Sequence, residues 1–301
     1  MAEEAPEREA MEYDVVIVGA GPAGLSAAIR LKQLAAAAGS EVSVAVLEKG
    51  AEVGAHILSG AVIDPCALNE LIPDWKEKGA PLDTPVTDDQ FKILGPAGAA
   101  SLPMFLMPPL FSNHGNYIVS LSNVTKWLAA QAEELGVEIY PGMAASEPVF
   151  DKGGALKGVV AGVFGIAKDG HKKPDYQPGM ELHGKYVFIA EGVRGSLAKV
   201  IQAKYGLADK SQPQKFGIGI KELWEVPKEQ HKPGLVLHTV GWPLDDKTGG
   251  GSFMYHFGDR QVYVGYVVHL NYKNPYISPF DVFQQHKLHP EIRTHIEGGK
   301  R

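Results

Sequence analysis

A glycine-rich turn near the start of the sequence has the spacing of a nucleotide-binding loop. Gly19, Gly21 and Gly24 form the pattern G-x-G-x-x-G in the stretch VVIVGAGPAGLSAAIRL. The first glycine permits a tight turn, the second lets the backbone approach a pyrophosphate, and the third allows close packing of helix on sheet. Glu48 follows 24 positions after Gly24, where its carboxylate can accept hydrogen bonds from ribose hydroxyls. The spacing predicts a dinucleotide site but leaves open which dinucleotide is bound.

The elements around this turn form a βαβ unit. Residues 15–18 are a continuous β-branched run, which is typical of a parallel strand buried on both faces. An Ala- and Leu-rich helix is expected at about residues 23–38, with Gly39 at its end, and a second strand at residues 42–47. The run at residues 187–190 is expected to return to the same sheet.

The rest of the chain predicts a mixed α/β (α+β) fold. A loop-rich region is expected at about residues 81–117, and alternating residues from about 215 onward predict an antiparallel sheet with a turn between Phe257 and Arg260. Ser278 and Pro279 are expected to open a late helix as its N-cap and first residue. Further elements are expected as a helix at 124–135 and strands at 137–140, 144–150 and 156–163.

One short stretch, SLPMFLMPPLF at residues 101–111, is unusually apolar. It is about half the roughly 20 residues that a membrane-spanning helix needs, so it cannot span. Pro108 and Pro109 remove two backbone hydrogen-bond donors, which disfavours both a strand and a long helix over this stretch. The stretch either packs beneath a loop-rich subdomain or rests on a membrane surface.

Composition limits the remaining possibilities. The chain has 301 residues, a formal charge of −6 and no basic block, which argues against nucleic acid as the main partner. Its one cysteine, Cys66, is expected to be an ordinary buried thiol and excludes a four-cysteine cluster contained in this chain. The first dozen residues have no leader signature, and the last, EIRTHIEGGKR, suggest a cut. No catalytic acid/base arrangement stands out.

Histidines could also carry chemistry. His286, His289 and His295 lie on one predicted helix and its exit, without a neighbouring carboxylate or cysteine set, so they are expected at the surface and no metal is expected in this chain. His56 and Ser59 follow Glu48 closely and face either the nucleotide or solvent.

The order of elements resembles that of FAD-binding domains of the glutathione-reductase type. A single fingerprint at the chain start, an inserted hairpin and the strand VFIAEG form this layout, so FAD is favoured over NAD. The glycine fingerprint occurs once, so the sequence shows no second Rossmann unit for NADH. Electrons are therefore expected to come from another donor. The expected FAD-binding residues are Val18, Gly19, Ala20, Gly21, Pro22, Ala23, Gly24, Glu48, Lys49, His56, Ser59, Gly60, Glu191 and Gly192.

Longer phrases carry a more specific resemblance. GAHILSGAVIDPCALNELIPDWKEKGAPLDTPV, IAEGVRGSLAK, HTVGWPLDDKTGGGSFMYH and NPYISPFDVFQQHKLHP together resemble the electron transfer flavoprotein-ubiquinone oxidoreductase family. The resemblance implies a monotopic membrane flavoprotein that takes electrons from reduced electron transfer flavoprotein and passes them through FAD to ubiquinone. It also implies a 4Fe-4S cluster, whose cysteines lie in a later segment than this chain contains.

The resemblance further assigns residues to ubiquinone and to the membrane. Gly250 and Gly251 would offer backbone donors to a quinone carbonyl. The family implies the cytoplasmic face of a bacterial inner membrane, or alternatively the matrix face of the mitochondrial inner membrane. The expected membrane contacts are Leu102, Met104, Phe105, Leu106, Met107, Leu110 and Phe111.

The expected domains follow from this layout. They are a flexible N-terminus at residues 1–12, an FAD-binding domain of the glutathione-reductase type at 13–212 that carries the apolar membrane-contact loop at about 91–113, and an inserted antiparallel-sheet ubiquinone-binding domain at 213–301, truncated at its end. Two alternatives stay open: an FAD-dependent monooxygenase or isoprenoid (geranylgeranyl) reductase relative, and a truncated, non-catalytic fragment.

Overall fold

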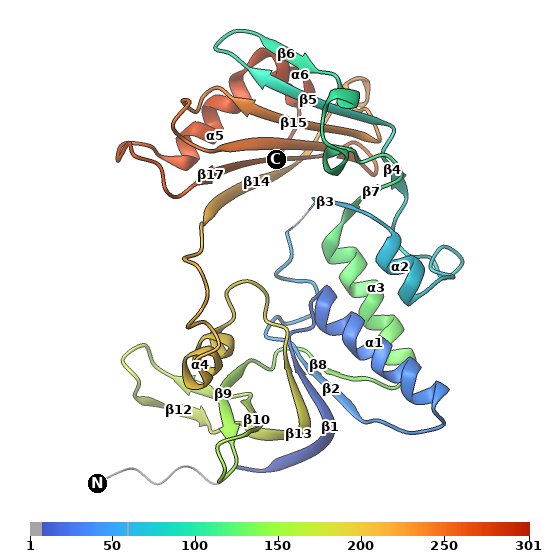
Figure 1. The fold of residues 1–301 in the computed structure, drawn as a ribbon, viewed down its shortest axis with the longest axis vertical. Coiled ribbons are helices and arrows are strands. Elements are labelled where there is room, and N and C mark those ends of the chain that lie inside the picture. The colour runs from blue at the N-terminus through green and yellow to red at the C-terminus, as the bar shows by residue number, and fades with distance from the viewer. Residues whose placement is uncertain (1–7, 59) are drawn as a thin grey trace. The chain divides into compact units, whose positions relative to one another are not determined.

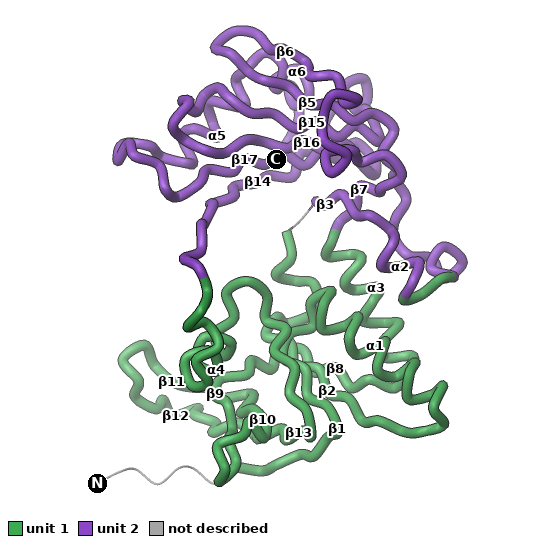
Figure 2. Tube along the Cα trace, viewed as in Figure 1, with its two compact units in different colours: residues 1–59, 71–73, 121–211 green, residues 60–70, 74–120, 212–301 purple. Residues whose placement is uncertain are grey.

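The chain is described from a computed structural model over residues 8–58 and 60–301. It divides into two compact units (Figure 2). Unit 1 consists of residues 1–59, 71–73 and 121–211, and unit 2 of residues 60–70, 74–120 and 212–301. Each unit is described by itself below.

Unit 1 is built on a six-stranded sheet in the order β8-β2-β1-β13-β10-β9 (Figure 1). The strands β8, β2, β1 and β13 run parallel, and β10 and β9 continue the sheet in antiparallel fashion. The four β-branched residues at 15–18 are buried, as a strand covered on both faces requires. The strands are β1 (Ala10–Val18), β2 (Val44–Leu47), β8 (Glu138–Tyr140), β9 (Ala145–Phe150), β10 (Leu156–Ala161) and β13 (Met180–Ile189).

Three helices and a short hairpin complete unit 1. The helix α1 begins at Pro22, directly after the glycine turn, and contacts α3. It ends before Gly39, whose φ of 62° ends the helix as predicted. The remaining elements of unit 1 are α1 (Pro22–Ala37), α3 (Leu121–Glu134), α4 (Ser196–Tyr205), β11 (Phe164–Ile166) and β12 (Lys172–Gln177).

Unit 2 contains a second six-stranded sheet, in the order β14-β17-β16-β15-β5-β6. The predicted alternation from residue 215 onward is confirmed by the antiparallel pairs β14–β17, β17–β16 and β16–β15. The strand β5 then joins β15 in parallel, with Asp88 opposite Leu235. The strands of this sheet are β5 (Asp88–Leu94), β6 (Ala99–Leu102), β14 (Gly217–Glu225), β15 (Leu235–Gly241), β16 (Gly250–Phe257) and β17 (Gln261–His269).

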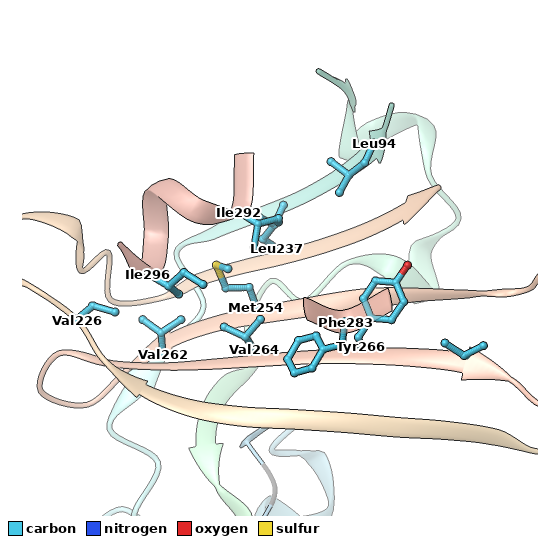
Figure 3. Close-up of a cluster of buried hydrophobic side chains, with 11 residues drawn as sticks. Leu94, Val226, Leu237, Met254, Val262, Val264, Tyr266, Phe283, Ile292 and Ile296 are labelled. Carbon is cyan, nitrogen blue, oxygen red and sulfur yellow. The ribbon is translucent and has the colours of Figure 1, made fainter. Parts of the chain in front are cut away.

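One face of this sheet packs against two C-terminal helices (Figure 3). Alternate residues of β17, among them Val262, Val264 and Tyr266, point into a core that also contains Phe283 and Ile292 from the helices. The predicted helix start is confirmed, because the Ser278 hydroxyl accepts a hydrogen bond from the Asp281 N–H at 3.3 Å. The other elements are α5 (Pro279–Leu288), α6 (Pro290–Ile296), α2 (Cys66–Leu71), β3 (Gly60–Ile63), β4 (Thr84–Pro85), β7 (Tyr117–Ser120) and the 3₁₀ turns η1 (Met104–Leu106), η2 (Pro109–Phe111) and η3 (Lys228–Gln230).

Several expectations differ from the structure. Residues 81–117 include the strands β5 and β6, and the region at about 91–113 lies in unit 2 rather than in the first domain because β5 pairs with β15. Residues 10–12 of the expected flexible N-terminus pair with β13, whereas residues 1–7 lie outside the described ranges. Cys66 is exposed rather than buried because it begins a short surface helix.

Candidate functional site

Unit 1 contains a cavity of about 620 Å³ at the carboxyl ends of β1, β2 and β13. This is the edge of a parallel sheet where ligands of α/β proteins bind. The cavity wall includes most residues of the predicted nucleotide site. Those present are Val18, Gly19, Ala20, Gly21, Pro22, Ala23, Glu48, Lys49, His56, Glu191 and Gly192.

The three fingerprint glycines have different surroundings. A Cβ on Gly19, whose φ is 108°, would lie 2.5 Å from the Ala190 carbonyl oxygen. A Cβ on Gly24 would lie 2.1 Å from the Gly19 oxygen, so Gly24 stands behind the cavity wall and permits the helix to pack. A Cβ on Gly21 would meet no described atom within 4 Å, so this glycine faces open space. The open side of Gly21 is where a pyrophosphate can approach the backbone.

The helix α1 presents its N-terminus to the same cavity. Gly21 is its N-cap and provides no side-chain hydrogen bond, and the first turn contains no acidic residue. The partial positive charge of this helix end is therefore available to an anionic ligand. Glu48, at the end of β2, accepts hydrogen bonds from the N–H of Ala20 at 3.2 Å and of Gly50 at 2.6 Å, which fixes its carboxylate at the cavity rim.

Glu191 and Gly192 line the cavity from the turn after β13. The Glu191 carboxylate accepts hydrogen bonds from the N–H of Ser196 at 3.1 Å and of Ala198 at 2.9 Å, so it caps the first turn of α4. Gly192 has a φ of 79°, which favours glycine there. Several residues of the cavity wall were not predicted from the sequence, and only their position near the predicted turns could have indicated them. They are Leu47, Gly54, Ile57, Met143, Ala144, Ala145, Ile189, Ala190, Arg194, Gly195 and Ser196.

Two residues of the predicted nucleotide site need separate comment. Gly60 belongs to unit 2 and is absent from the wall of the unit 1 cavity; a Cβ there would lie 1.8 Å from the Tyr263 ring, so the glycine makes room for that ring. Ser59 lies outside the described residues.

Unit 2 contains a second cavity, of about 410 Å³, on the sheet face opposite the α5 and α6 core. Gly251 forms part of its floor, whereas Gly250 does not line it. A Cβ on Gly250 would lie 2.2 Å from the Val267 carbonyl oxygen, so this glycine allows the strands to approach. The lining residues are Phe91, Leu110, Phe111, Asn113, His238, Thr239, Val240, Gly251, Ser252, Phe253 and Val267.

The apolar loop, residues 102–111, is largely exposed, and its Leu110 and Phe111 line this cavity. Phe105, Leu106 and Leu110 are 85%, 70% and 97% exposed, and Phe111 is also exposed. The other three predicted contacts, Leu102, Met104 and Met107, are half-buried. Exposure of several large apolar side chains within one short loop is unusual for a surface that faces water.

The apolar loop is attached to the sheet at its C-terminal end. The Asn113 N–H donates to the Asp89 carboxylate at 2.7 Å, and the Asn113 side-chain amide donates to the same carboxylate at 3.2 Å. The Phe111 ring packs edge-on against Phe91 of β5, with ring centroids 5.6 Å apart. These contacts hold Phe111 beside the cavity.

His238 is the titratable side chain of this cavity wall. Its Nε2 lies 3.0 Å from the Tyr255 hydroxyl. Burial lowers the pKa of His238, and the nearby Asp89 charge opposes that shift. Burial also raises the pKa of Tyr255 to about 12, so this hydroxyl stays protonated near neutral pH. Only the alternating pattern LVLHTVG could have indicated His238 before the structure was known.

The histidines near the end of the chain are buried, not at the surface as predicted. His286 and His289 are each 1% exposed and His295 is 8% exposed, because α5 and α6 pack these side chains against the sheet. His295 Nδ1 lies 3.1 Å from Nε2 of His256, and His289 Nε2 lies 3.0 Å from the Gly95 carbonyl oxygen. Within residues 8–58 and 60–301, no group of three or more His, Cys, Asp or Glu side chains could hold a metal ion.

Two family models match the chain. Residues 216–301 match the model described as ETF-QO, ubiquinone-binding, and residues 17–73 match the NAD(P)-binding Rossmann-like domain. The first match lies in unit 2 and contains β14 to β17, which include the floor of the second cavity. The second contains the glycine turn and Glu48.

Curated relatives share much more of the sequence. The electron transfer flavoprotein-ubiquinone oxidoreductase of Pseudomonas aeruginosa is 58% identical over 297 residues, which are 98% of this chain and 54% of the relative. The mitochondrial proteins of the same name from Oryza sativa and Homo sapiens are each 54% identical, over 97% and 98% of the chain and 50% and 48% of the relatives. The chain thus spans about half the length of these oxidoreductases.

Solved structures agree with the fold expected for the oxidoreductase family. A geranylgeranyl bacteriochlorophyll reductase-like protein from Thermoplasma acidophilum has a TM-score of 0.67 and 18% identity, covering 97% of this chain and 64% of that chain. The myxobacterial halogenase CndH has a TM-score of 0.60 and 15% identity, covering 96% and 61%. These similarities confirm the predicted fold class, a Rossmann-like domain combined with an antiparallel sheet. Among the described residues, no helix is both long and apolar enough to cross a membrane.

Proposed function

We propose that this chain provides the FAD and ubiquinone sites of an electron transfer flavoprotein-ubiquinone oxidoreductase. In this proposal, electrons from reduced electron transfer flavoprotein pass through FAD to ubiquinone at a membrane surface. The observation that carries the proposal is the second cavity, where Gly251 and the exposed apolar loop lie at one site within unit 2. The 58% identity to the Pseudomonas protein supports the same function.

The first cavity fits FAD. The open side of Gly21 and the N-terminus of α1 suit a pyrophosphate, and the fixed carboxylate of Glu48 suits a ribose. Lys49, His56, Glu191 and Gly192 would complete the contacts along the cavity wall. Bound FAD would supply the redox chemistry, while the chain holds it in position and sets the polarity around it. Gly24 and Gly60 allow close packing within the fold, and we do not propose that they contact FAD.

The second cavity fits the head group of a quinone. Its aromatic and aliphatic walls suit a flat apolar ring, and the missing side chain of Gly251 leaves the backbone accessible to a carbonyl oxygen. A Cβ on Gly251 would also lie 2.6 Å from the Thr239 carbonyl oxygen, so the position requires glycine. We propose Gly251 as the direct contact and Gly250 as the residue that shapes the strand beside it.

The apolar loop would place this cavity at a membrane surface. Its most exposed apolar side chains, Phe105, Leu106 and Leu110, can enter one leaflet without crossing it, as in interfacial anchors. A quinone with an apolar tail could then move from the bilayer past Leu110 and Phe111 into the cavity. We propose a monotopic association with the cytoplasmic face of a bacterial inner membrane, or with the matrix face of the mitochondrial inner membrane.

We propose electron transfer flavoprotein as the electron donor. We also propose that the full-length protein holds a 4Fe-4S cluster in a segment outside these 301 residues. The alternative is an FAD-dependent monooxygenase or isoprenoid reductase, which shares the fold of the Thermoplasma protein. NADPH separates the two functions, because rapid flavin bleaching by NADPH would favour the alternative and contradict electron transfer flavoprotein as the donor.

Ligand binding by the purified chain tests the proposal. We expect a flavin absorption spectrum after incubation with FAD, and saturable quenching of protein fluorescence by decylubiquinone. A folded chain that binds neither ligand would contradict autonomous cofactor binding and leave a non-catalytic fragment. Circular dichroism provides the control for folding.

A further inference from the structure

The second cavity holds one group that the proposed function does not yet use. His238 is flanked across the sheet by Phe91 of β5 and Phe253 of β16, and both rings line the same cavity. Apart from Asn113, whose amide is bound to Asp89, the other side chains of the wall are apolar or small hydroxyls. His238 is therefore the titratable side chain that a ligand in this cavity would meet.

The surroundings of His238 hold its ring in one orientation. Nε2 is 3.0 Å from the Tyr255 hydroxyl, and Tyr255 is itself buried and stacked on Phe253. Among the described residues, Nδ1 has no hydrogen-bond partner in the protein. Tyr255 on β16 and Asp89 on β5 are the titratable groups that act on this ring, since the apolar loop contains none.

We propose that His238 donates a proton to a carbonyl oxygen of the bound quinone, and that Tyr255 and Asp89 position and charge it for that task. The proposal rests on the quinone site of the proposed function. Quinone reduction adds two electrons and two protons, so that each carbonyl oxygen becomes a hydroxyl. The electrons come from a reductant such as a reduced flavin. One N–H bond of the protonated ring breaks as one O–H bond forms, and water supplies the other proton and recharges the ring.

The electrostatics of the cavity favour protonation of His238 at the point where the quinone is reduced. Burial keeps His238 mostly neutral near neutral pH, so the empty cavity does not carry a stable positive charge. Negative charge that develops on the quinone oxygen would favour the imidazolium, and the Asp89 carboxylate already acts in that direction. The Tyr255 hydroxyl can donate to Nε2 when the ring is neutral and accept from it when the ring is protonated.

Quinone binding to the chain is the first test. With decylubiquinone as the probe and fluorescence quenching as the readout, His238→Phe is expected to weaken binding about 5- to 30-fold, because one hydrogen bond is lost. His238→Gln keeps a donor and is expected to bind within about threefold of the parent chain. His114→Gln, an exposed histidine outside the cavity, is the matched control.

Reduction of the bound quinone by dithionite is the second test. His238→Gln is expected to slow quinol formation at least about tenfold and to remove its pH dependence, since an amide does not titrate. Tyr255→Phe is expected to retain that pH dependence at a lower rate. Equal binding by His238→Phe and the parent, or an unchanged rate and pH profile in His238→Gln, would overturn the proposal. If the parent chain binds no quinone, the proposed function itself fails.

Discussion

At the scale of single residues, two glycines of the same turn have separable roles. Gly24→Ala places a methyl group 2.1 Å from the Gly19 oxygen and is expected to destabilise the chain by about 1–3 kcal/mol. Gly21→Ala places it in open space and uses an extended backbone, with φ −79° and ψ 176°, that alanine adopts without strain. It is therefore expected to preserve stability but to prevent FAD from approaching the turn.

Thermal unfolding without FAD and flavin fluorescence quenching measure these two effects separately. The prediction is contradicted if Gly21→Ala binds FAD as tightly as the parent chain, or if Gly24→Ala unfolds at the same temperature as the parent.

The buried histidine His286 makes unit 2 sensitive to acid. Burial lowers its pKa to about 3, and the charge of nearby His289 contributes. Because this value lies below the ordinary 6.5, the unfolded chain binds the proton more readily than the folded chain. The stability that depends on neutral His286 is complete above about pH 6.5 and is lost as pH falls towards 3. His256 and His295, with pKa values lowered to about 3 and about 4 by burial, act in the same direction.

Replacement of His286 by leucine tests this linkage. Both ring nitrogens are buried without a hydrogen-bond partner, and the ring lies 4.8 Å from that of Tyr266. His286→Leu is expected to raise the free energy of unfolding by about 1–3 kcal/mol near neutral pH, and by more near pH 5. Urea unfolding at both pH values measures the change. An exposed control, His114→Leu, should alter neither value, and an identical pH dependence in His286→Leu and the parent would contradict the assignment.

At the scale of elements, the apolar loop can be tested apart from the cavity. Phe105 and Leu106 are exposed and do not line the cavity. Each can contribute about 1.5–3 kcal/mol if buried in lipid, so the double change Phe105→Ser and Leu106→Ser is expected to weaken binding to phosphatidylcholine liposomes at least about 100-fold. Flavin content should be unchanged, because these side chains lie in unit 2 and the FAD cavity in unit 1.

The matched control uses exposed apolar side chains elsewhere. Phe164 and Ile166 of β11 are 61% and 51% exposed, and their joint replacement by serine is expected to leave liposome binding intact. Flotation in a density gradient measures both variants. Equal flotation of the Phe105 and Leu106 variant and the parent would show that the apolar loop does not anchor the chain.

Elements set by local pattern could be predicted from sequence, whereas those set by distant pairing could not. The strand at residues 15–18, the turn after it and the helix α1 depend on neighbouring residues, and their types and approximate bounds are confirmed. The strand β5 depends on β15, and no local signal distinguishes it from the Pro- and Gly-rich segment around it. For the same reason, most of the residues predicted to bind a nucleotide lie in the wall of one cavity, whereas His238 and Asp89 come together only through that long-range pairing.

At the scale of the whole molecule, both units are discontinuous in sequence. Unit 2 takes residues 60–70 and 74–120 from the middle of unit 1 and completes its sheet with residues after 212. A boundary between residues 212 and 213 is therefore not a place to divide the protein. Each unit needs segments that flank the other, and this explains why a division at a single position, as expected from the order of elements, does not separate them.

This arrangement has a consequence for synthesis on the ribosome. Asp88 of β5 pairs with Leu235 of β15, which is 147 positions later. At about 5–20 residues per second, β5 waits roughly 7–30 s for its partner strand to be translated. During that interval the apolar loop has no completed sheet beside it and remains a target for chaperones or for the membrane itself. Early capture by lipid could thus fix the loop before the cavity next to it exists.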